Sequence, residues 1–401
     1  MSVRFCAMRA SASGAEWEDA DVIYLDNAAT SFPKPPRVQE EQNRCMRLYC
    51  GNPGRGSHRL AMQAAEKIFE CRGELASLFG SRHPENVVFT MNATMALNTA
   101  IKGLLQQGDH VLISDLEHNA VWRPVCRLAR EGRITYDVFP SYALFPDRTP
   151  EQICRGIEAR VRPNTRMLVC THASNICPVT MPLREIGELC RRLGLLFVVD
   201  ASQSAGHIPV DMEEMRIDAL CAPGHKGLFG VQGSGFVLLG EDLYADTLLE
   251  GGSGVNSLDE AMPDEAPERY EAGTLPTPAI AGLCEGVRAI KEIGLDAIAE
   301  REHMLCGQLL ERLSSLRGIQ ISVPHARGPV VLFHSPRLPA DRIGAELDRR
   351  GICVRTGFHC AALAHRTLRS PADGAVRVSP GYYNTKADID ALWRALREIL
   401  E

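Results

Sequence analysis

The chain has 401 residues, of which 45% are hydrophobic and 23% are charged, and its formal net charge is −6. This composition is typical of a globular protein large enough for two lobes with separate cores. The negative net charge provides no basic footprint for nucleic acid, and no apolar run is long enough to cross a membrane, so we expect neither partner. Residues 1–20 contain no apolar secretory segment and are expected to form a loosely ordered tail.

The fourteen cysteines form neither a disulfide scaffold nor a metal site by their spacing. None occurs in a C-x-x-C pair, and no Cys/His cluster has zinc-finger spacing. Several, such as Cys170 and Cys221, lie in apolar stretches, where a free cysteine behaves as a small hydrophobe. We therefore expect no metal and a reducing, cytoplasmic location.

The N-terminal segment predicts a short strand, a turn and a proline-stiffened loop. Residues 24–30 read YLDNAAT, and prolines follow at positions 33, 35 and 36. Residues 51–58 (GNPGRGSH) predict an irregular loop before an amphipathic helix at 60–79. Taken alone, these residues indicate ordinary connecting loops in which Arg55 is solvated.

From residue 86 onward, short apolar runs alternate with amphipathic stretches. The predicted strands are 86–90, 111–114, 134–139, 167–171, 195–199 and 217–222, and the predicted helices are 92–105, 120–130, 150–161 and 182–193. This alternation predicts an α/β domain with a mostly parallel sheet. No Rossmann G-x-G-x-x-G or Walker loop occurs in these units, which disfavours a nucleotide site.

Polar residues follow two of these strands, where α/β proteins bind ligands. Asp200 ends one run, and Lys226 follows the other in a turn. An aldehyde cofactor with a basic ring nitrogen needs an amine and a carboxylate, and these two residues supply that pair. Thr94, at the start of a predicted helix, suits a phosphate site or an ordinary N-cap. Each residue alone would more often be a loop cap or a solvated charge.

The C-terminal half predicts a connector and a second lobe. Residues 248–277 lack apolar periodicity, and a long helix is expected from about residue 278. The predicted strands of the lobe are 319–323, 330–333, 352–355 and 376–379, with helices at 339–350 and 386–400. We therefore divide the chain into a tail (1–20), a large domain (21–276) and a small domain (277–401), with 21–50 a candidate to pack on the small domain.

Residues 355–360 read RTGFHC and carry a candidate nucleophile, Cys360. The thiolate is the reactive form of cysteine, and neighbouring cations lower the thiol pKa. Arg355 and His359 are local candidates for that role. The alternative is that Cys360 is one more buried thiol, although its polar, glycine-containing surroundings differ from those of the strand cysteines.

Several motifs together resemble one enzyme family. D-x-x-Q at 200–203, H-K at 225–226 and R-x-G-x-x-C at 355–360 are similar to motifs of SufS-type, second-group cysteine desulfurases, which are fold-type I pyridoxal-phosphate (PLP) enzymes of aminotransferase class V. The resemblance extends from about Tyr24 to Trp393. It implies a large PLP-binding domain with a mostly parallel, seven-stranded sheet and a smaller α+β C-terminal domain that carries the catalytic cysteine.

The resemblance also implies roles for individual residues. The implied catalytic residues are Lys226, Cys360 and His118. The implied cofactor-binding residues are Lys226, Asp200, Gln203, His225, Ala93, Thr94, His118 and Thr274, and the implied substrate-binding residues are Arg377, Asn175, Arg355, Asn27 and Ala28. Residues 270–274 (YEAGT) match a segment that enters the neighbouring subunit's site, which implies a homodimer with shared active sites.

The implied activity converts L-cysteine, or L-selenocysteine, to L-alanine and leaves a persulfide on Cys360 for a sulfur-acceptor protein, as in iron–sulfur cluster assembly. Two departures stand out: Pro223 replaces a Ser or Thr phosphate ligand, and Phe358 replaces the first His of H-H-C. Proline has no N–H, so His225 and Thr94 would carry more of the phosphate. The alternatives are a selenocysteine lyase or another class-V reaction, and a non-catalytic PLP-binding partner in a sulfur-transfer complex.

Overall fold

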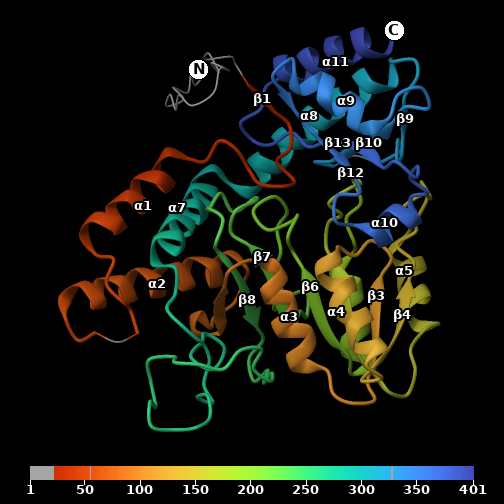
Figure 1. Cartoon of the computed structure of the whole chain (residues 1–401). Helices are drawn as coiled ribbons and strands as arrows, with labels where there is room; N and C mark the ends of the chain where they lie inside the picture. Colours follow the sequence, from red (N-terminus) through yellow and green to blue (C-terminus); the bar gives the residue numbers. More distant parts are fainter. Residues whose placement is uncertain (1–21, 55, 327) are drawn as a thin grey trace.

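The computed structural model describes residues 22–401 except 55 and 327. The predicted tail at 1–20 and Arg55 of the predicted loop at 51–58 therefore lie outside the described residues. Figure 1 shows a large lobe built around a central sheet and a smaller lobe, formed by the C-terminal part of the chain, above one edge of that sheet.

The central sheet has seven strands in the order β2-β8-β7-β6-β5-β3-β4. Their bounds are β2 Val87–Thr90, β3 His110–Ser114, β4 Thr135–Phe139, β5 Thr165–Thr171, β6 Leu196–Asp200, β7 Ala219–Pro223 and β8 Gly235–Leu239. Only β8 runs in the opposite direction to the other strands, so its pairs with β2 and β7 are antiparallel and the remaining pairs are parallel. The predicted mostly parallel sheet is confirmed, and its uninterrupted apolar runs arise because helices cover both faces.

Two apolar cores lie on opposite faces of this sheet. One contains residues of α2 (Arg59–Leu78), α5 (Pro150–Glu158), α6 (Leu183–Leu193) and α7 (Thr277–Ile293), and the other contains residues of α3 (Ala93–Leu104) and α4 (Asn119–Arg130). The large lobe is thus a three-layer α/β unit, in which the carboxyl ends of five parallel strands, β3 to β7, open toward the small lobe (Figure 1).

The small lobe contains an antiparallel sheet in the order β12-β13-β10-β9. Its strands are β9 Gln320–Ile321, β10 Val331–His334, β12 Arg355–Gly357 and β13 Ala375–Val378, and its helices are α8 Leu295–Ser314, α9 Ala340–Asp348, α10 Ala362–Thr367 and α11 Lys386–Leu400. A short pair between β1 (Ile23–Tyr24) and β11 (Ile352–Cys353) joins the N-terminal segment to this lobe. Helix α1 (Pro36–Leu48) then packs along α7.

Three details differ from the sequence-based expectations. The single helix expected from residue 278 is two helices, because Gly294 adopts φ 90° between α7 and α8. The single strand expected at 352–355 is divided between β11 and β12, which belong to different sheets. Helices α1 and α10 were not expected. The predicted connector is confirmed, since residues 240–276 contain no helix or strand.

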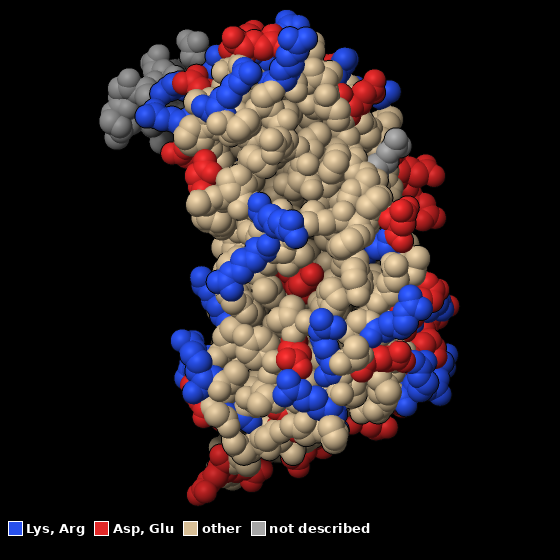
Figure 2. Space-filling view, turned by 90° about the vertical axis from the view of Figure 1, so that its right-hand side faces the viewer, with Lys and Arg blue, Asp and Glu red and all other residues tan. Residues whose placement is uncertain are grey.

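Lysine and arginine side chains are interspersed with aspartate and glutamate over the face shown in Figure 2. Within residues 22–401, apart from the two undescribed positions, no helix combines the length and apolar character needed to span a bilayer.

Candidate active site

A cavity of about 230 Å³ lies between the carboxyl ends of the central strands and the small lobe. Most of the predicted site residues line it: Ala28, Ala93, Thr94, His118, Asn175, Asp200, Gln203, His225, Lys226, Arg355, Cys360 and Arg377. They come from eight separate segments of the chain, so the cavity exists only in the folded arrangement of both lobes. Asn27 and Thr274 are the predicted residues that do not line it.

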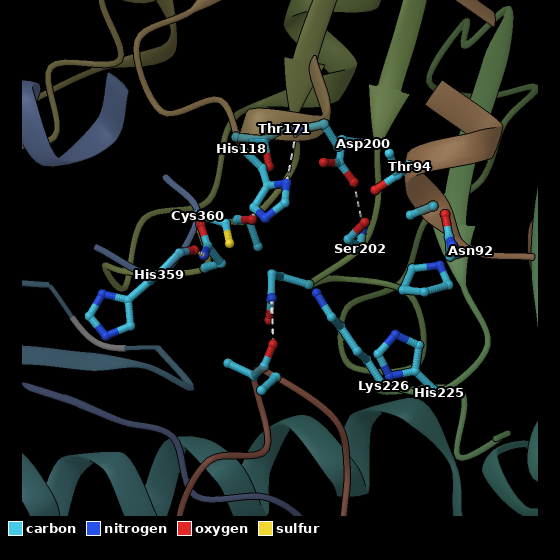
Figure 3. Close-up of a pocket in the computed structure, with 18 of the residues that line it drawn as sticks. Asn92, Thr94, His118, Thr171, Asp200, Ser202, His225, Lys226, His359 and Cys360 are labelled. Atoms are coloured by element: carbon cyan, nitrogen blue, oxygen red, sulfur yellow. Dashed lines mark hydrogen bonds between the residues drawn. The ribbon is translucent and has the colours of Figure 1, made fainter. Parts of the chain in front are cut away.

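Lys226 lies three residues beyond β7, and its side chain extends into the cavity (Figure 3). Its backbone is held in place by Ser31, whose hydroxyl donates to the Lys226 carbonyl at 2.7 Å. Among the described residues, none forms a hydrogen bond or ion pair with Nζ. Burial lowers the Lys226 pKa to about 8, although the negative charge of Asp200 opposes this shift. A larger fraction of the amine is therefore in its neutral, nucleophilic form near neutral pH than for an ordinary lysine.

Asp200 ends β6, and its carboxylate is only 2% exposed. Its Oδ1 accepts a hydrogen bond from the Ser202 amide at 2.9 Å, which fixes its direction toward the cavity (Figure 3). Gln203, in the turn that follows, donates from Nε2 to the Ala28 carbonyl at 2.9 Å. A buried carboxylate facing a buried amine is a charge arrangement suited to a cofactor with a basic ring nitrogen.

His118 forms the N-cap of α4, where its Nδ1 accepts from the Ala120 amide at 3.0 Å. This bond places the proton of the neutral ring on Nε2. Burial lowers the His118 pKa, with Asp200 opposing that effect. The ring lies close to Asp200 in the cavity (Figure 3), so a neutral imidazole is presented there whose Nε2–H has no hydrogen-bond partner among the described residues.

The N-terminus of α3 provides a site for an anion. Asn92 caps this helix by accepting from the Met95 amide at 2.9 Å, so the alternative that Thr94 is an ordinary N-cap is wrong. The Thr94 hydroxyl and the first amides of α3 instead face the cavity edge. A Cβ at Gly235 would lie 2.7 Å from the Asn92 backbone, which explains a glycine at this close approach.

His225 adds a second polar group to this anion site. Its Nδ1 is buried and has no hydrogen-bond partner among the described residues, and burial lowers its pKa to about 4. An orphaned ring nitrogen, free helix amides, a buried amine and a buried carboxylate in one cavity fit PLP. Pro223 also lines the cavity, where it supplies no donor.

Cys360 faces the same cavity from the small lobe (Figure 3). It is exposed, and both His359 and Cys360 adopt left-handed backbone conformations, with φ of 51° and 54°. Two bonds attach this turn to the large lobe: the Asn119 amide donates to the Cys360 carbonyl at 2.8 Å, and Asn175 Nδ2 donates to the His359 carbonyl at 2.9 Å. The nucleophile and Lys226 therefore line the same cavity.

The expectation that His359 acts as a cation beside the thiol is wrong. Its side chain is 5% exposed and points away from Cys360 (Figure 3), toward His365. Burial lowers the His359 pKa to about 3, and the neighbouring Arg377 acts in the same direction. The imidazole is therefore neutral, and Arg355 is the remaining local cation of the motif.

Arg377 is almost fully buried at 2% exposure and is held by two bonds. Its Nη2 donates to Asp26 Oδ1 at 2.5 Å, and its Nη1 donates to the Asn175 carbonyl at 3.1 Å. Its Nε is buried without a partner among the described residues. Burial lowers the Arg377 pKa while Asp26 opposes the shift. A fixed guanidinium at the cavity wall suits a substrate carboxylate.

Asn27 and Thr274 lie outside the cavity. Asn27 is buried and joins the N-terminal segment to the small lobe, donating from Nδ2 to the Ser379 carbonyl at 3.1 Å and to Asn384 Oδ1 at 3.2 Å. Thr274 is exposed and accepts from Asn52 Nδ2 at 3.4 Å. The implied contact of Thr274 with a neighbouring subunit stays a prediction.

Two residues near the site were not identified from the sequence. Lys34 Nζ donates to the His225 carbonyl and to Ser31 Oγ, both at 2.7 Å, and burial lowers its pKa to about 7. Glu117 is fully buried, accepts from the Thr171 amide at 2.7 Å, and has its pKa raised by burial to about 8. The sequence signals for these two residues were a lysine between two prolines (Lys34) and an acid next to the loop histidine (Glu117). Neither pattern indicates which atoms the side chain contacts.

Known proteins resemble this chain over most of its length. The model of the aminotransferase class-V family matches residues 23–392. A probable cysteine desulfurase from Methanothermobacter thermautotrophicus is 32% identical over 388 residues, covering 94% of this chain and 95% of the relative, and one from Halalkalibacterium halodurans is 31% identical over 395 residues, covering 96% and 95%. The apo structure of a cysteine desulfurase from Thermococcus onnurineus has a TM-score of 0.84 at 30% identity and covers 95% of both chains. The crystal structure of the cysteine desulfurase CsdA (S-sulfonic acid) from Escherichia coli has a TM-score of 0.84 at 25% identity and covers 95% of this chain and 96% of that chain.

Proposed function

The chain belongs to the cysteine desulfurases of the aminotransferase class-V family, and on this premise we propose that it converts L-cysteine to L-alanine and retains the sulfur as a persulfide on Cys360. The family is PLP-dependent. The observation that carries the proposal is that Lys226, Asp200 and Cys360 line a single cavity. An amine, a carboxylate and a thiol in one enclosed space are the groups that this reaction requires.

PLP, when bound, supplies an electron sink that stabilises negative charge at the substrate α-carbon. Lys226 would hold its aldehyde, Asp200 would keep a proton on its ring nitrogen, and Gln203 would donate to its phenolic oxygen. The phosphate would lie at the start of α3, where it contacts Ala93, Thr94 and His225. In a homodimer with shared sites, Thr274 would reach the phosphate of the neighbouring subunit.

The substrate would be oriented by its carboxylate. Arg377 is the main partner proposed, with Arg355 beside it, and Asn175 holds Arg377 in place through its carbonyl. The neutral Lys226 amine then takes the α-proton onto Nζ, and the Nε2–H of His118 is positioned to return a proton to the substrate. Ala28 approaches the substrate through its backbone, which Gln203 fixes. Asn27 shapes that segment from outside the cavity.

The sulfur is transferred by displacement. The Cys360 thiolate attacks the substrate sulfur, an S–S bond forms and the substrate C–S bond breaks. The electron pair of the broken bond stays with the substrate, whose β-carbon takes up a proton, so that a persulfide remains on Cys360 and alanine remains in the site. The thiolate of a sulfur-acceptor protein then attacks the terminal sulfur, and Cys360 leaves as a thiolate. The same steps apply to L-selenocysteine, and the acceptor would direct the sulfur to iron–sulfur clusters or thio-cofactors.

Location and domain organisation are further parts of the proposal. The thirteen cysteines within the described residues are all unpaired, which favours a reducing, cytoplasmic environment. We retain a large PLP-binding domain (21–276) and a small domain (277–401) that carries Cys360. In this division α7 is a shared element, since its apolar face belongs to the large-lobe core.

The test is product analysis with two variants. The wild-type protein with PLP and an added thiol reductant, which cleaves the Cys360 persulfide, should release alanine and sulfide from L-cysteine. Cys360→Ala should keep the visible absorbance of bound PLP while losing desulfuration of cysteine. Lys226→Ala should lose that absorbance. A keto acid as product would instead indicate transamination, turnover of selenocysteine alone would indicate a lyase, and no turnover by PLP-loaded protein would favour a non-catalytic partner.

A further inference from the structure

Three side chains, those of His359, His365 and Ser370, form a hydrogen-bonded chain behind the nucleophile. They take no part in the steps above. His359 Nδ1 is 3.1 Å from His365 Nε2, and His365 Nδ1 is 2.8 Å from Ser370 Oγ. The other nitrogen of His359, Nε2, is 3.3 Å from the Arg355 carbonyl. The two imidazoles are 5% and 4% exposed and stack at 15° with 5.3 Å between centroids.

The protonation states of these three side chains follow from the acceptor at one end, the Arg355 carbonyl. The Arg355 carbonyl can only accept, so His359 Nε2 carries the hydrogen. Burial keeps His359 neutral, and Arg377 and Arg355 face it with like charges, so its Nδ1 has a lone pair and must accept. His365 Nε2 therefore donates, His365 Nδ1 accepts, and Ser370 donates. This arrangement satisfies every nitrogen, and a proton added to His359 Nδ1 would set its N–H against the N–H of His365 Nε2.

The chain supports a strained turn. His359 and Cys360 both adopt positive φ, which non-glycine residues avoid, and such conformations persist only where the surroundings fix them. The large lobe holds the carbonyls of both residues through Asn175 and Asn119. Those bonds restrain the peptide groups but not the side chain of His359, which the His365 ring holds from the opposite side.

We propose that the His359–His365–Ser370 chain is a positioning device for Cys360: it fixes the turn so that the thiol faces the cavity, and it exchanges no proton with the sulfur. Figure 3 shows the geometry behind this assignment, since the His359 ring is directed away from the thiol. His359 and His365 are thus positioning residues. The inference rests on the proposed function, because it concerns the approach of that thiol to the substrate sulfur.

The test compares His365→Leu, which removes both bonds of the ring, with His365→Gln, whose amide can still donate to His359. His303→Leu, an exposed change on α8, is the matched control. Single-turnover persulfide formation on Cys360, with PLP and L-cysteine, should fall about 10- to 100-fold in His365→Leu, because a misplacement near 1 Å costs up to about 100-fold. His365→Gln should stay within about threefold of wild type, and cysteine affinity should stay within about twofold in all variants.

Two measurements do not depend on turnover. Hydrogen–deuterium exchange of the peptide spanning 357–370 should accelerate in His365→Leu and not in His303→Leu. The pH midpoint of Cys360 alkylation by iodoacetamide should be unchanged in His365→Leu, because the imidazoles are neutral and directed away from the sulfur. If His365→Leu fails to fold, Ser370→Ala should show the same changes with smaller amplitude.

Wild-type persulfide formation or unchanged exchange in His365→Leu would overturn the proposal. An upward shift of the alkylation midpoint by about one unit would also overturn it, since His359 or His365 would then act on the thiolate directly. Absence of persulfide in the wild-type protein would refute the proposed function instead, while exchange and alkylation would still decide whether the chain fixes the turn.

Discussion

The lowered pKa of Lys226 predicts how the cofactor-free protein captures PLP as a function of pH. Only the neutral amine attacks an aldehyde. With an ordinary pKa of 10.5, about 0.03% of the amine would be neutral at pH 7, whereas a pKa of about 8 gives about 9%. Burial in this cavity therefore increases the reactive fraction roughly 300-fold at pH 7.

Replacing Asp200 with Asn tests the electrostatics of this site. The Asp200 carboxylate raises the Lys226 pKa against the effect of burial, so its removal should lower that pKa by about one unit or more. Capture of PLP at pH 6 to 7 should become faster. Desulfuration should nevertheless be lost, because no carboxylate remains to hold a proton on the ring nitrogen. One substitution is thus expected to move two activities in opposite directions.

The assay follows visible absorbance after PLP is mixed with protein freed of cofactor by hydroxylamine and dialysis, between pH 5.5 and 10. Asp218→Asn is the control, because Asp218 accepts from the Phe197 amide at the start of β6, at the opposite end of this strand from the cavity. Its midpoint should equal that of the wild type, near pH 8. A wild-type midpoint near 10.5, or an upward shift in Asp200→Asn, would refute the reasoning.

Two further predictions concern buried charges outside the cavity. Glu271→Ala removes the carboxylate that the buried Arg72 guanidinium binds at 2.6 and 2.8 Å. Loss of one partner of a buried ion pair costs about 3–5 kcal/mol of unfolding free energy, or roughly 4–6 °C in Tm for a chain of this size. Glu292→Ala breaks an exposed ion pair and should shift Tm by less than about 1 °C. Equal shifts in calorimetry would contradict this estimate. His207→Gln should destabilise the protein at pH 6 but little at pH 9. Burial alone lowers the His207 pKa, but Glu302, 2.9 Å away, raises that pKa overall. The stabilisation by this pair is therefore complete below the unfolded-state pKa of about 6.5 and is lost as the pH rises through the raised folded-state pKa. A Tm difference independent of pH would contradict the assigned charge on His207.

The sheet and most of its helices could be predicted because their signals are local. Strands buried on both faces must be uninterrupted apolar runs, and helices between them must be amphipathic. Helix α10 has only six residues after the strained turn at Cys360, so it is too short for a periodic pattern. The break at Gly294 was missed because a single glycine inside a helical pattern is often tolerated.

The cavity residues could be identified from the sequence for a different reason. Asp200, His118 and Lys226 directly follow parallel strands or their turns, and topology alone brings those positions to one edge of the sheet. Lys34 and Glu117 could not be identified this way, because the contacts that tie them to the site, with the His225 carbonyl and the Thr171 amide, involve backbone atoms of distant segments. His359 was assigned the wrong role because adjacency to Cys360 in the sequence does not determine where a side chain points.

The reaction depends on contacts between the two lobes more than on any single lobe. Asn175, on the large lobe, accepts from Arg377 through its carbonyl and donates to the His359 carbonyl through its side chain. The same residue therefore restrains the group proposed to bind the substrate carboxylate and the turn that carries the nucleophile. Since the sulfur lies at a fixed number of bonds from that carboxylate, displacing Asn175 would change both ends of the attack geometry together.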